Sequence, residues 1–276
     1  MTTLAVLIQK EFRDAIRSRW LSGFGITFSV LALGISWVGS AGASIGGYSG
    51  FGRTTAALIN LVLLIVPLLG LALGSMSISQ EREKGTLAHL LALPLNPGEV
   101  FWSKFLGLSF VLIVSLGVAF GVTGLGMIFQ SGVRDGMLYI QGFLATLPLA
   151  LVSLSMGLLI SSFCRKVALS ISLTFLAWLM LVFGGDLGLL GSSLAVKLAP
   201  GVLLASTLLN PLSLYRIIAI DLVGAHLEML GPAGHCAQDL LGRWLVPIGL
   251  GSLFFWIAGA LAVSYRIYIR NPLREN

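Results

Sequence analysis

The sequence predicts an all-α integral membrane protein with six transmembrane helices. Three observations lead to this fold class: only 10% of the 276 residues are charged, 57% are apolar, and the charges cluster between long uncharged intervals. Soluble domains contain about 25% charged residues, and the mean hydropathy of +0.97 excludes an ordinary soluble enzyme. Two cysteines are too few for a disulfide scaffold. Residues 1–276 are therefore expected to form a single transmembrane domain.

Six uncharged intervals are long enough to cross a bilayer, because a helix rises about 1.5 Å per residue and the hydrocarbon core is about 30 Å thick. These intervals predict spans at residues 21–41, 56–78, 105–129, 138–163, 167–186 and 244–268. They are continuously apolar and lack the alternation of membrane β-strands, which favours helices.

The distribution of basic residues predicts that both termini lie in the cytoplasm. With six spans and an inner N-terminus, twelve of the 17 Lys and Arg residues flank the inner side of the membrane and five flank the outer side. An excess of Lys and Arg marks cytoplasmic segments. A seventh span would move the three C-terminal arginines outside, so six spans agree better with this rule. We expect a multi-pass protein of the bacterial inner membrane.

The outer segment, residues 187–243, is too long for a structureless loop and predicts two or three short helices. Its uncharged stretch at residues 198–215 contains Pro200, Asn210 and Pro211. Broken apolar stretches of this kind lie at the interface, or enter the membrane where protein shelters them. We expect a helix break at Asn210-Pro211, and a seventh span over this stretch is the alternative.

Residues 4–19 show the periodicity of an amphipathic helix before the first span. The apolar side holds Leu4, Ala5, Leu7, Ile8, Phe12, Ala15 and Ile16, and the polar side holds Lys10, Arg13, Asp14 and Arg17. A helix with one apolar and one basic face is suited to lie on the inner leaflet. The alternative is a charged flank that only anchors the first span.

The cytoplasmic segment at residues 79–104 carries the strongest functional signal. Four charges of alternating sign directly follow the second span: Glu81, Arg82, Glu83 and Lys84. The pattern then breaks at Gly85, and the Thr86 hydroxyl is suited to cap the start of a new helix. A short helix over residues 87–93 would end before Pro94.

Leu87, Leu90 and Leu91 share one face of that short helix and form an apolar knob. Dense charge beside an apolar knob is typical of a docking surface, whereas a solvated loop is the alternative. We expect the knob to dominate docking affinity, since one buried leucine contributes about 1.5–3 kcal/mol and an exposed ion pair about 0–1 kcal/mol. The preceding charges are expected to orient the partner through charge pairs.

No motif predicts catalysis, a metal site or a cofactor. The chain lacks the P-loop, the zinc-protease pattern and the nucleophile elbow. A loose outer group contains residue types that bind copper or zinc, namely His226, Met229, His235 and Cys236, but its spacing fits no defined site. We expect no catalytic residue, no metal ligand and no cofactor in this chain.

Inside the spans, the sequence indicates packing rather than chemistry. Glycines four residues apart, at Gly70/Gly74 and Gly117/Gly121, predict close approach of helices. Asp186 follows 19 uncharged residues, which places it at the outer interface and argues against a buried proton relay. An intramembrane enzyme is therefore the least favoured class of function.

Residues 81–87, together with Leu90, Leu91, Pro94 and Lys104, resemble the signature loop of ABC-2 type transporter permeases. The resemblance extends to the amphipathic N-terminal helix, the six spans and the proline-containing outer element. It implies a permease without ATPase activity, which pairs with a second copy of itself and with two copies of a cytoplasmic ABC ATPase that binds ATP and Mg²⁺. The implied ATPase-coupling residues are Glu81, Arg82, Glu83, Gly85, Thr86, Leu87, His89, Leu90 and Leu91.

Within that family, the chain resembles the permease subunits of transporters that mature nitrous oxide reductase in denitrifying bacteria. This resemblance implies a periplasmic accessory protein as a further partner. It also implies a substrate such as a sulfur species for assembly of a periplasmic copper–sulfur centre. The alternatives are an ABC-2 exporter permease for another substrate and a membrane anchor for a periplasmic assembly complex.

Overall fold

The computed structural model describes residues 3–16, 19–46, 51–86, 96–131, 136–194, 207–222 and 242–270. Within these ranges the regular structure is entirely helical. Six helices of 26 to 35 residues follow the order of the predicted spans: α2 (Arg19–Gly46), α3 (Phe51–Glu83), α5 (Pro97–Ser131), α6 (Gly136–Phe163), α7 (Val167–Leu194) and α11 (Leu245–Arg270). The predicted all-α fold class is confirmed.

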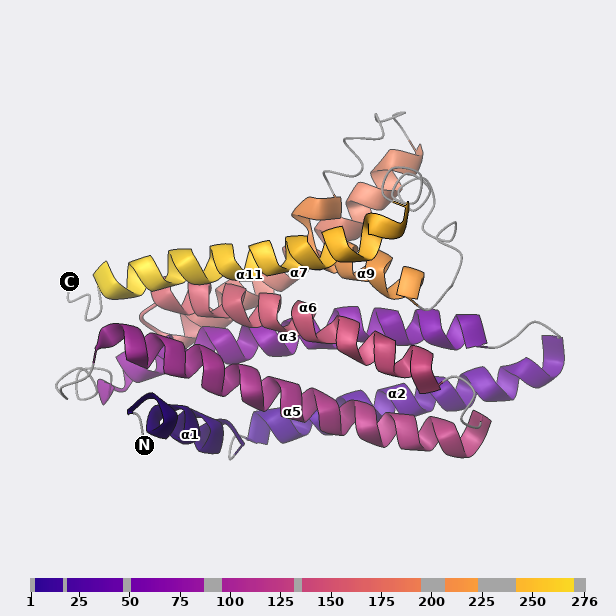
Figure 1. The fold of residues 1–276 in the computed structure, drawn as a ribbon, viewed down its shortest axis with the longest axis horizontal. Helices are drawn as coiled ribbons and strands as arrows, with labels where there is room; N and C mark the ends of the chain where they lie inside the picture. The colour runs from indigo at the N-terminus through magenta and orange to yellow at the C-terminus, as the bar shows by residue number, and fades with distance from the viewer. Residues whose placement is uncertain are drawn as a thin grey trace.

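Most of the long helices run side by side, and shorter elements complete the described chain (Figure 1). These are α1 (Thr3–Ile16), α9 (Pro211–Leu222) and the 3-10 turn η3 (Gly242–Trp244). One end of the bundle, which we call the charged end, holds α1, the C-terminal ends of α3, α6 and α11, and the N-terminal ends of α5 and α7 (Figure 1). Because α1 and the end of α11 share it, the arrangement agrees with an even number of spans.

Five of the long helices are apolar over a length sufficient to cross a membrane. These stretches are Ala57–Glu83, Pro97–Gly126, Tyr139–Phe163, Val167–Gly185 and Leu245–Arg270, and α2 contributes a shorter one, Gly23–Ile35, among its described residues. Their burial by protein differs widely. In the most apolar part of α3, 61% of residues are buried, against 11% in α7. The helix α3 is therefore central in the bundle and α7 is peripheral.

The helices α3 and α6 approach each other at glycines. A methyl group added at Gly74 would lie 2.7 Å from the backbone nitrogen of Leu158, and one added at Gly70 would lie 2.9 Å from the carbonyl oxygen of Ala150. A methyl group at Gly157 of α6 would likewise meet the backbone of α3. The close packing predicted at Gly70 and Gly74 is confirmed.

At Gly117 and Gly121 no such approach occurs within one described chain. A methyl group at Gly117 would have Phe143 as its nearest neighbour at 3.9 Å, and one at Gly121 would meet nothing within 4 Å. Two glycines four residues apart leave one face of a helix without side chains. A neighbouring helix approaches that face only where contacts elsewhere in the bundle hold it there.

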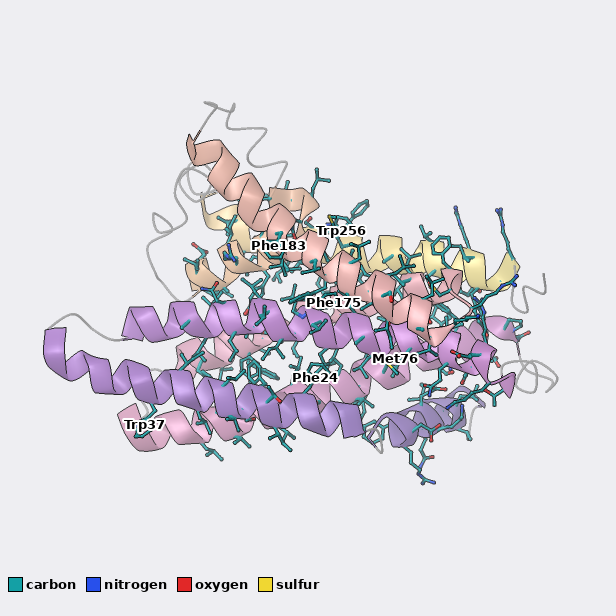
Figure 2. All side chains as sticks on the ribbon, turned by 180° about the vertical axis from the view of Figure 1, so that it is seen from behind. Phe24, Trp37, Met76, Phe175, Phe183 and Trp256 are labelled. Carbon is teal, nitrogen blue, oxygen red and sulfur yellow. The ribbon has the colours of Figure 1, made fainter. Side chains whose placement is uncertain are left out.

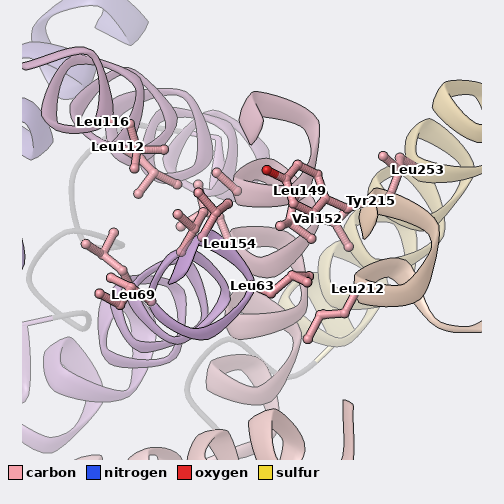
Figure 3. Close-up of a cluster of buried hydrophobic side chains, with 14 of the residues drawn as sticks. Leu63, Leu69, Leu112, Leu116, Leu149, Val152, Leu154, Leu212, Tyr215 and Leu253 are labelled. Atoms are coloured by element: carbon pink, nitrogen blue, oxygen red, sulfur yellow. The ribbon is translucent and has the colours of Figure 1, made fainter. Parts of the chain in front are cut away.

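Leucines of several helices form the core beside the α3–α6 contact (Figure 3). They include Leu69 of α3, Leu112 of α5, Leu149 and Leu154 of α6, and Leu212 of α9, each buried. The core therefore joins elements that lie far apart in the sequence, including the short helix from the broken outer segment.

The broken outer segment places α9 inside the protein. Pro211 begins this helix, and the Asn210 side chain accepts the backbone N–H of Leu212 at 2.9 Å, a helix-capping contact. The same side chain donates to the carbonyl of Leu181 in α7 at 2.7 Å. Most of α9 is buried, and it contacts α3, α6, α7 and α11. The predicted break at Asn210-Pro211 and the shelter by protein are therefore confirmed, whereas residues 198–206 of the predicted stretch lie outside the described residues.

Helices occupy more of the segment at residues 79–104 than the sequence predicts. The helix α3 continues to Glu83, and α5 already begins at Pro97. Gly85 has a φ of +69°, so it ends α3 in the left-handed conformation. The Thr86 hydroxyl donates back to the carbonyl of Glu81 at 3.4 Å, and Thr86 itself is again helical after the turn at Lys84 and Gly85, as predicted for the start of a new helix. The predicted short helix at 87–93 lies outside the described residues.

Candidate functional site

The last turn of α3 lies at the centre of the charged end, where many nitrogen- and oxygen-bearing side chains gather (Figure 2). This turn carries Glu81, Arg82 and Glu83, three of the residues singled out from the sequence. Each of them contacts a different neighbouring element. The turn therefore joins the helix α3 to most of the charged end.

Glu81 forms the core of an ion-pair cluster between α1, α3 and α5. Its carboxylate lies 2.7 Å from the ammonium group of Lys104, and that ammonium lies 3.2 Å from the carboxylate of Glu11. The Lys10 ammonium lies 3.3 Å from the Glu11 carboxylate and 3.5 Å from the Glu81 carboxylate. The Lys104 side chain is only 1% exposed, whereas Lys10 is 43% exposed. The cluster thus contains one buried and one solvated ammonium group.

The cluster also fixes the position of α1. At Gly107 of α5 an added methyl group would lie 2.7 Å from Glu11, and the rings of Phe12 and Phe110 are 5.2 Å apart. The predicted amphipathic helix is confirmed, but its inner face packs on α5 and is not only a lipid-facing surface. Burial lowers the pKa of Lys10, but the carboxylates of Glu11 and Glu81 outweigh it and raise that pKa above its usual value.

Arg82 and Glu83 bind the connection between α6 and α7. The Arg82 guanidinium donates to the carbonyls of Ser162 and Cys164 at 2.8 and 3.2 Å, where α6 ends. The Glu83 carboxylate accepts the backbone N–H of Val167 at 2.7 Å, where α7 begins. A cation at a helix C-terminus and an anion at a helix N-terminus are both favourable placements. The two charges therefore join α3 to both helices.

The other predicted coupling residues continue from this turn. Gly85 and Thr86 are exposed and directly follow it, while Leu87, His89, Leu90 and Leu91 lie outside the described residues. The contacts of Glu11 and Lys104 could not be found from sequence, because 93 positions separate them. One signal was present, since Glu11 is an acidic residue on the apolar side of the predicted helix, seven positions after Leu4.

The candidate metal ligands are not tested by this geometry. His226, Met229, His235 and Cys236 lie outside the described residues. Within the part that the structure describes, no group of three or more His, Cys, Asp or Glu residues could hold a metal ion. Cys164 is a buried free thiol in the α6–α7 connection, and burial raises its pKa. It is therefore a poorly reactive thiol at neutral pH.

The family described as ABC-2 family transporter protein matches residues 5–273. The chain belongs to this family. The probable ABC transporter permease protein NosY of Pseudomonas aeruginosa is 29% identical to this ABC-2 chain over 283 aligned positions, covering 99% of the chain and 100% of the relative. NosY of Stutzerimonas stutzeri is also 29% identical, over 96% of the chain and 97% of the relative.

A shorter similarity links this ABC-2 protein to the inner membrane transport permease YhhJ of Escherichia coli. The two are 35% identical over 69 residues, which are 25% of the chain and 17% of the relative. The full-length family match and the two NosY relatives are the broader similarities. The ABC-2 chain is therefore a multi-pass membrane permease subunit of an ABC transporter.

Proposed function

We propose that this permease couples ATP hydrolysis by a separate cytoplasmic ATPase to movement of a substrate across the bacterial inner membrane. In this proposal the charged end lies in the cytoplasm, as the distribution of Lys and Arg indicates. The observation that carries it is the linkage of the last turn of α3 to α1, α5, α6 and α7 through Glu81, Arg82 and Glu83. A displacement of the following segment would move these helices together rather than α3 alone.

The proposed coupling residues divide into two groups. Gly85, Thr86, Leu87, His89, Leu90 and Leu91 contact the ATPase, and Glu81, Arg82 and Glu83 hold the base of this contact segment within the permease. This division revises the expectation that the three charges pair with the partner, because each has a partner inside the chain. The leucines then supply most of the docking free energy, since an apolar side chain buried at the interface contributes about 1.5–3 kcal/mol.

We further propose that two copies of the chain pair and bind two ATPases. Two features of the described surface support a second copy. The helix α7 is the least buried of the five apolar stretches, and Asn60 exposes its amide within the apolar stretch of α3. An amide that faces lipid lacks hydrogen-bond partners, which is unfavourable. A native mass that corresponds to one permease per two ATPases would reject the pairing.

The finer function that we propose is the supply of a sulfur species for the copper–sulfur centre of nitrous oxide reductase, together with a periplasmic accessory protein. It rests on the resemblance of residues 81–94 and on near-full-length similarity to two NosY permeases. ATP and Mg²⁺ belong to the ATPase in this proposal, and the permease carries no cofactor. A strain without the chain that still assembles an intact copper–sulfur centre would contradict it.

Two substitutions test the proposed coupling residues, and they should differ in whether the ATPase stays bound. Leu90→Asp should release the ATPase, because a carboxylate cannot be buried in an apolar groove. Glu83→Ala should retain the ATPase but lower transport-linked ATP hydrolysis, since it removes the link to Val167 of α7. The measurements are co-purification through gel filtration and ATP hydrolysis by the reconstituted complex.

Conservative variants serve as controls for this experiment. Leu90→Met keeps the apolar side chain and should keep the complex, and Lys84→Ala removes an exposed neighbouring charge and should leave hydrolysis near the native rate. If the Leu90→Asp permease stays bound to an active ATPase, the segment is not the docking site. The orientation is checked separately by the accessibility of Lys166→Cys from the cytoplasmic side.

A further inference from the structure

Buried serines surround the last turns of α3, just before the charged cluster. We call them the serine joint: Ser75 and Ser79 of α3, Ser161 and Ser162 of α6, Ser170 of α7, and Ser264 of α11. Each is at most 1% exposed. Four helices therefore meet through hydroxyl groups inside an otherwise apolar bundle, where every hydrogen bond is shielded from water.

Ser161 makes the most unusual contact of the joint. Its hydroxyl oxygen accepts the backbone N–H of Ile78 at 3.0 Å and the backbone N–H of Ser79 at 2.9 Å. A hydroxyl oxygen has two lone pairs and can accept both bonds. Within a helix, these N–H groups normally bond to carbonyls four residues earlier. A side chain of α6 therefore inserts into the backbone hydrogen bonding of α3.

The carbonyl of Ser75 shows the complementary arrangement. It accepts the hydroxyl of Ser79 at 2.7 Å and the hydroxyl of Ser170 at 2.7 Å. The second bond joins α3 to α7. Side chains that insert into a helical hydrogen-bond ladder are an identified cause of local bending. The turn between Ser75 and Ser79 is thus shaped by α6 and α7 rather than by α3 alone.

The joint extends from α6 to α11. The hydroxyl oxygens of Ser162 and Ser264 lie 2.7 Å apart, and Ser264 also donates to the carbonyl of Leu158 at 3.2 Å. One residue of the joint, Ser162, offers its carbonyl to Arg82. The joint is therefore continuous with the base of the contact segment, and it adds α11 to the helices connected to α3.

We propose that Ser161 is a positioning residue for energy coupling: by holding the backbone of Ile78 and Ser79, it transmits displacement of the contact segment from α3 to α6 and, through Ser162 and Ser264, to α11. This inference rests on the proposed function. The charges further along α3 bind α1, α5, α6 and α7 directly, whereas α11 is connected through the joint and through the contacts of Phe101 of α5 with Tyr265 and Tyr268. Without the Ser161 hydroxyl, the contacts at Gly70, Gly74 and Arg82 still join α3 to α6, so the displacement is transmitted to α6 and α11 less fully rather than lost.

The test compares Ser161→Ala with Ser155→Ala in the complex with the ATPase. Ser155 is a matched control because it lies on the same helix, is fully buried, and bonds only to the carbonyl of Val152 in its own helix. Ser161→Ala should keep the complex and the KM for ATP, and lower the kcat of transport-linked hydrolysis about three- to hundredfold, the range for loss of one or both of the hydrogen bonds that Ser161 accepts. Ser155→Ala should change neither value.

Hydrogen exchange gives a second measurement that does not depend on the ATPase. In Ser161→Ala the amides of Ile78 and Ser79 should exchange about three- to tenfold faster, and in Ser155→Ala they should exchange at the native rate. Unchanged exchange in Ser161→Ala would overturn the contact itself. Faster exchange with native kcat would overturn its role in coupling. Failure of the proposed function appears elsewhere, as an ATPase that stays bound to Leu90→Asp.

Discussion

The two sides of α3 hold this helix by different kinds of contact. Toward α6 the contact inside the bundle is neutral, with backbones brought together at Gly74 and hydroxyl groups bonding across the serine joint, and Arg82 adds a charge at the end of α3. Toward α1 and α5 the contact is ionic, with Glu81 pairing to the buried Lys104 and the solvated Lys10. Both sides bind the same few turns of one helix.

The difference shows what each contact requires. The neutral side depends on the absence of a side chain at Gly74, so it is sensitive to volume and insensitive to salt. The ionic side depends on matched charges. Its sensitivity to salt increases with the exposure of each pair, because buried pairs are screened much less than exposed ones. Substitutions on the two sides should therefore destabilise the protein for different reasons and by different amounts.

The largest effect is expected from Lys104→Met on the ionic side. This change leaves the carboxylates of Glu81 and Glu11 without their buried partner, and removal of one member of a buried pair costs up to about 3–5 kcal/mol. The thermal unfolding temperature of the detergent-solubilised protein should fall accordingly. Lys166→Met, which removes an exposed lysine, is the control and should unfold near the native temperature.

Rescue sharpens this prediction. Adding Glu81→Gln and Glu11→Gln to Lys104→Met removes the unpaired charges and should restore more than half of the lost stability, because neutral amides are less costly to bury. If Lys104→Met unfolds at the same temperature as Lys166→Met, the cluster does not stabilise the charged end.

A smaller effect is expected from Gly74→Ala on the neutral side. The added methyl group would lie 2.7 Å from the backbone of Leu158, and overpacking of this kind costs about 1–3 kcal/mol. Gly121→Ala adds the same group where nothing lies within 4 Å, and it should be neutral or stabilising. Equal unfolding temperatures for the two variants would show that α3 and α6 are not in close contact.

The smallest effect is expected from Lys10→Gln, which removes the solvated ammonium group. Its pairs are exposed, so the loss should be about 0–1 kcal/mol and should shrink further in high salt. Because folding raises the pKa of Lys10, its contribution is fully present below pH 10.5 and is lost as pH rises through the raised pKa. The stability difference from the native protein should therefore stay constant between about pH 6 and 9; a difference that varies with pH there would contradict this assignment.

Local patterns in the sequence predicted several elements correctly. The apolar intervals located the long helices, the amphipathic periodicity located α1, and Asn210-Pro211 located the start of α9. Each of these depends on residues close together in the chain. The same reasoning located the new helical start at Thr86, but it did not predict that the Thr86 hydroxyl bonds backward to Glu81, because a hydroxyl can bond to the backbone of either neighbouring helix.

Contacts between distant residues could not be predicted in this way. The glycine pairs Gly70/Gly74 and Gly117/Gly121 have the same spacing, but only the first faces a neighbouring backbone. Ser161 and Ile78 are 83 positions apart, and nothing in either local sequence indicates their contact. The buried serines of the spans join four helices, and no local pattern marks them for this role.

The sequence by itself therefore determined the membrane class, the number and order of the long helices, and the segment at residues 81–91 that resembles a permease signature. Tertiary structure alone decided that α3 is central and α7 peripheral, although their apolar stretches have similar hydropathy, 2.5 and 2.2. Hydropathy measures the transfer of one helix into an apolar surrounding, and lipid and protein neighbours are equally apolar. The choice between them depends on shape, hydroxyl bonds and ion pairs, which arise only when distant helices meet.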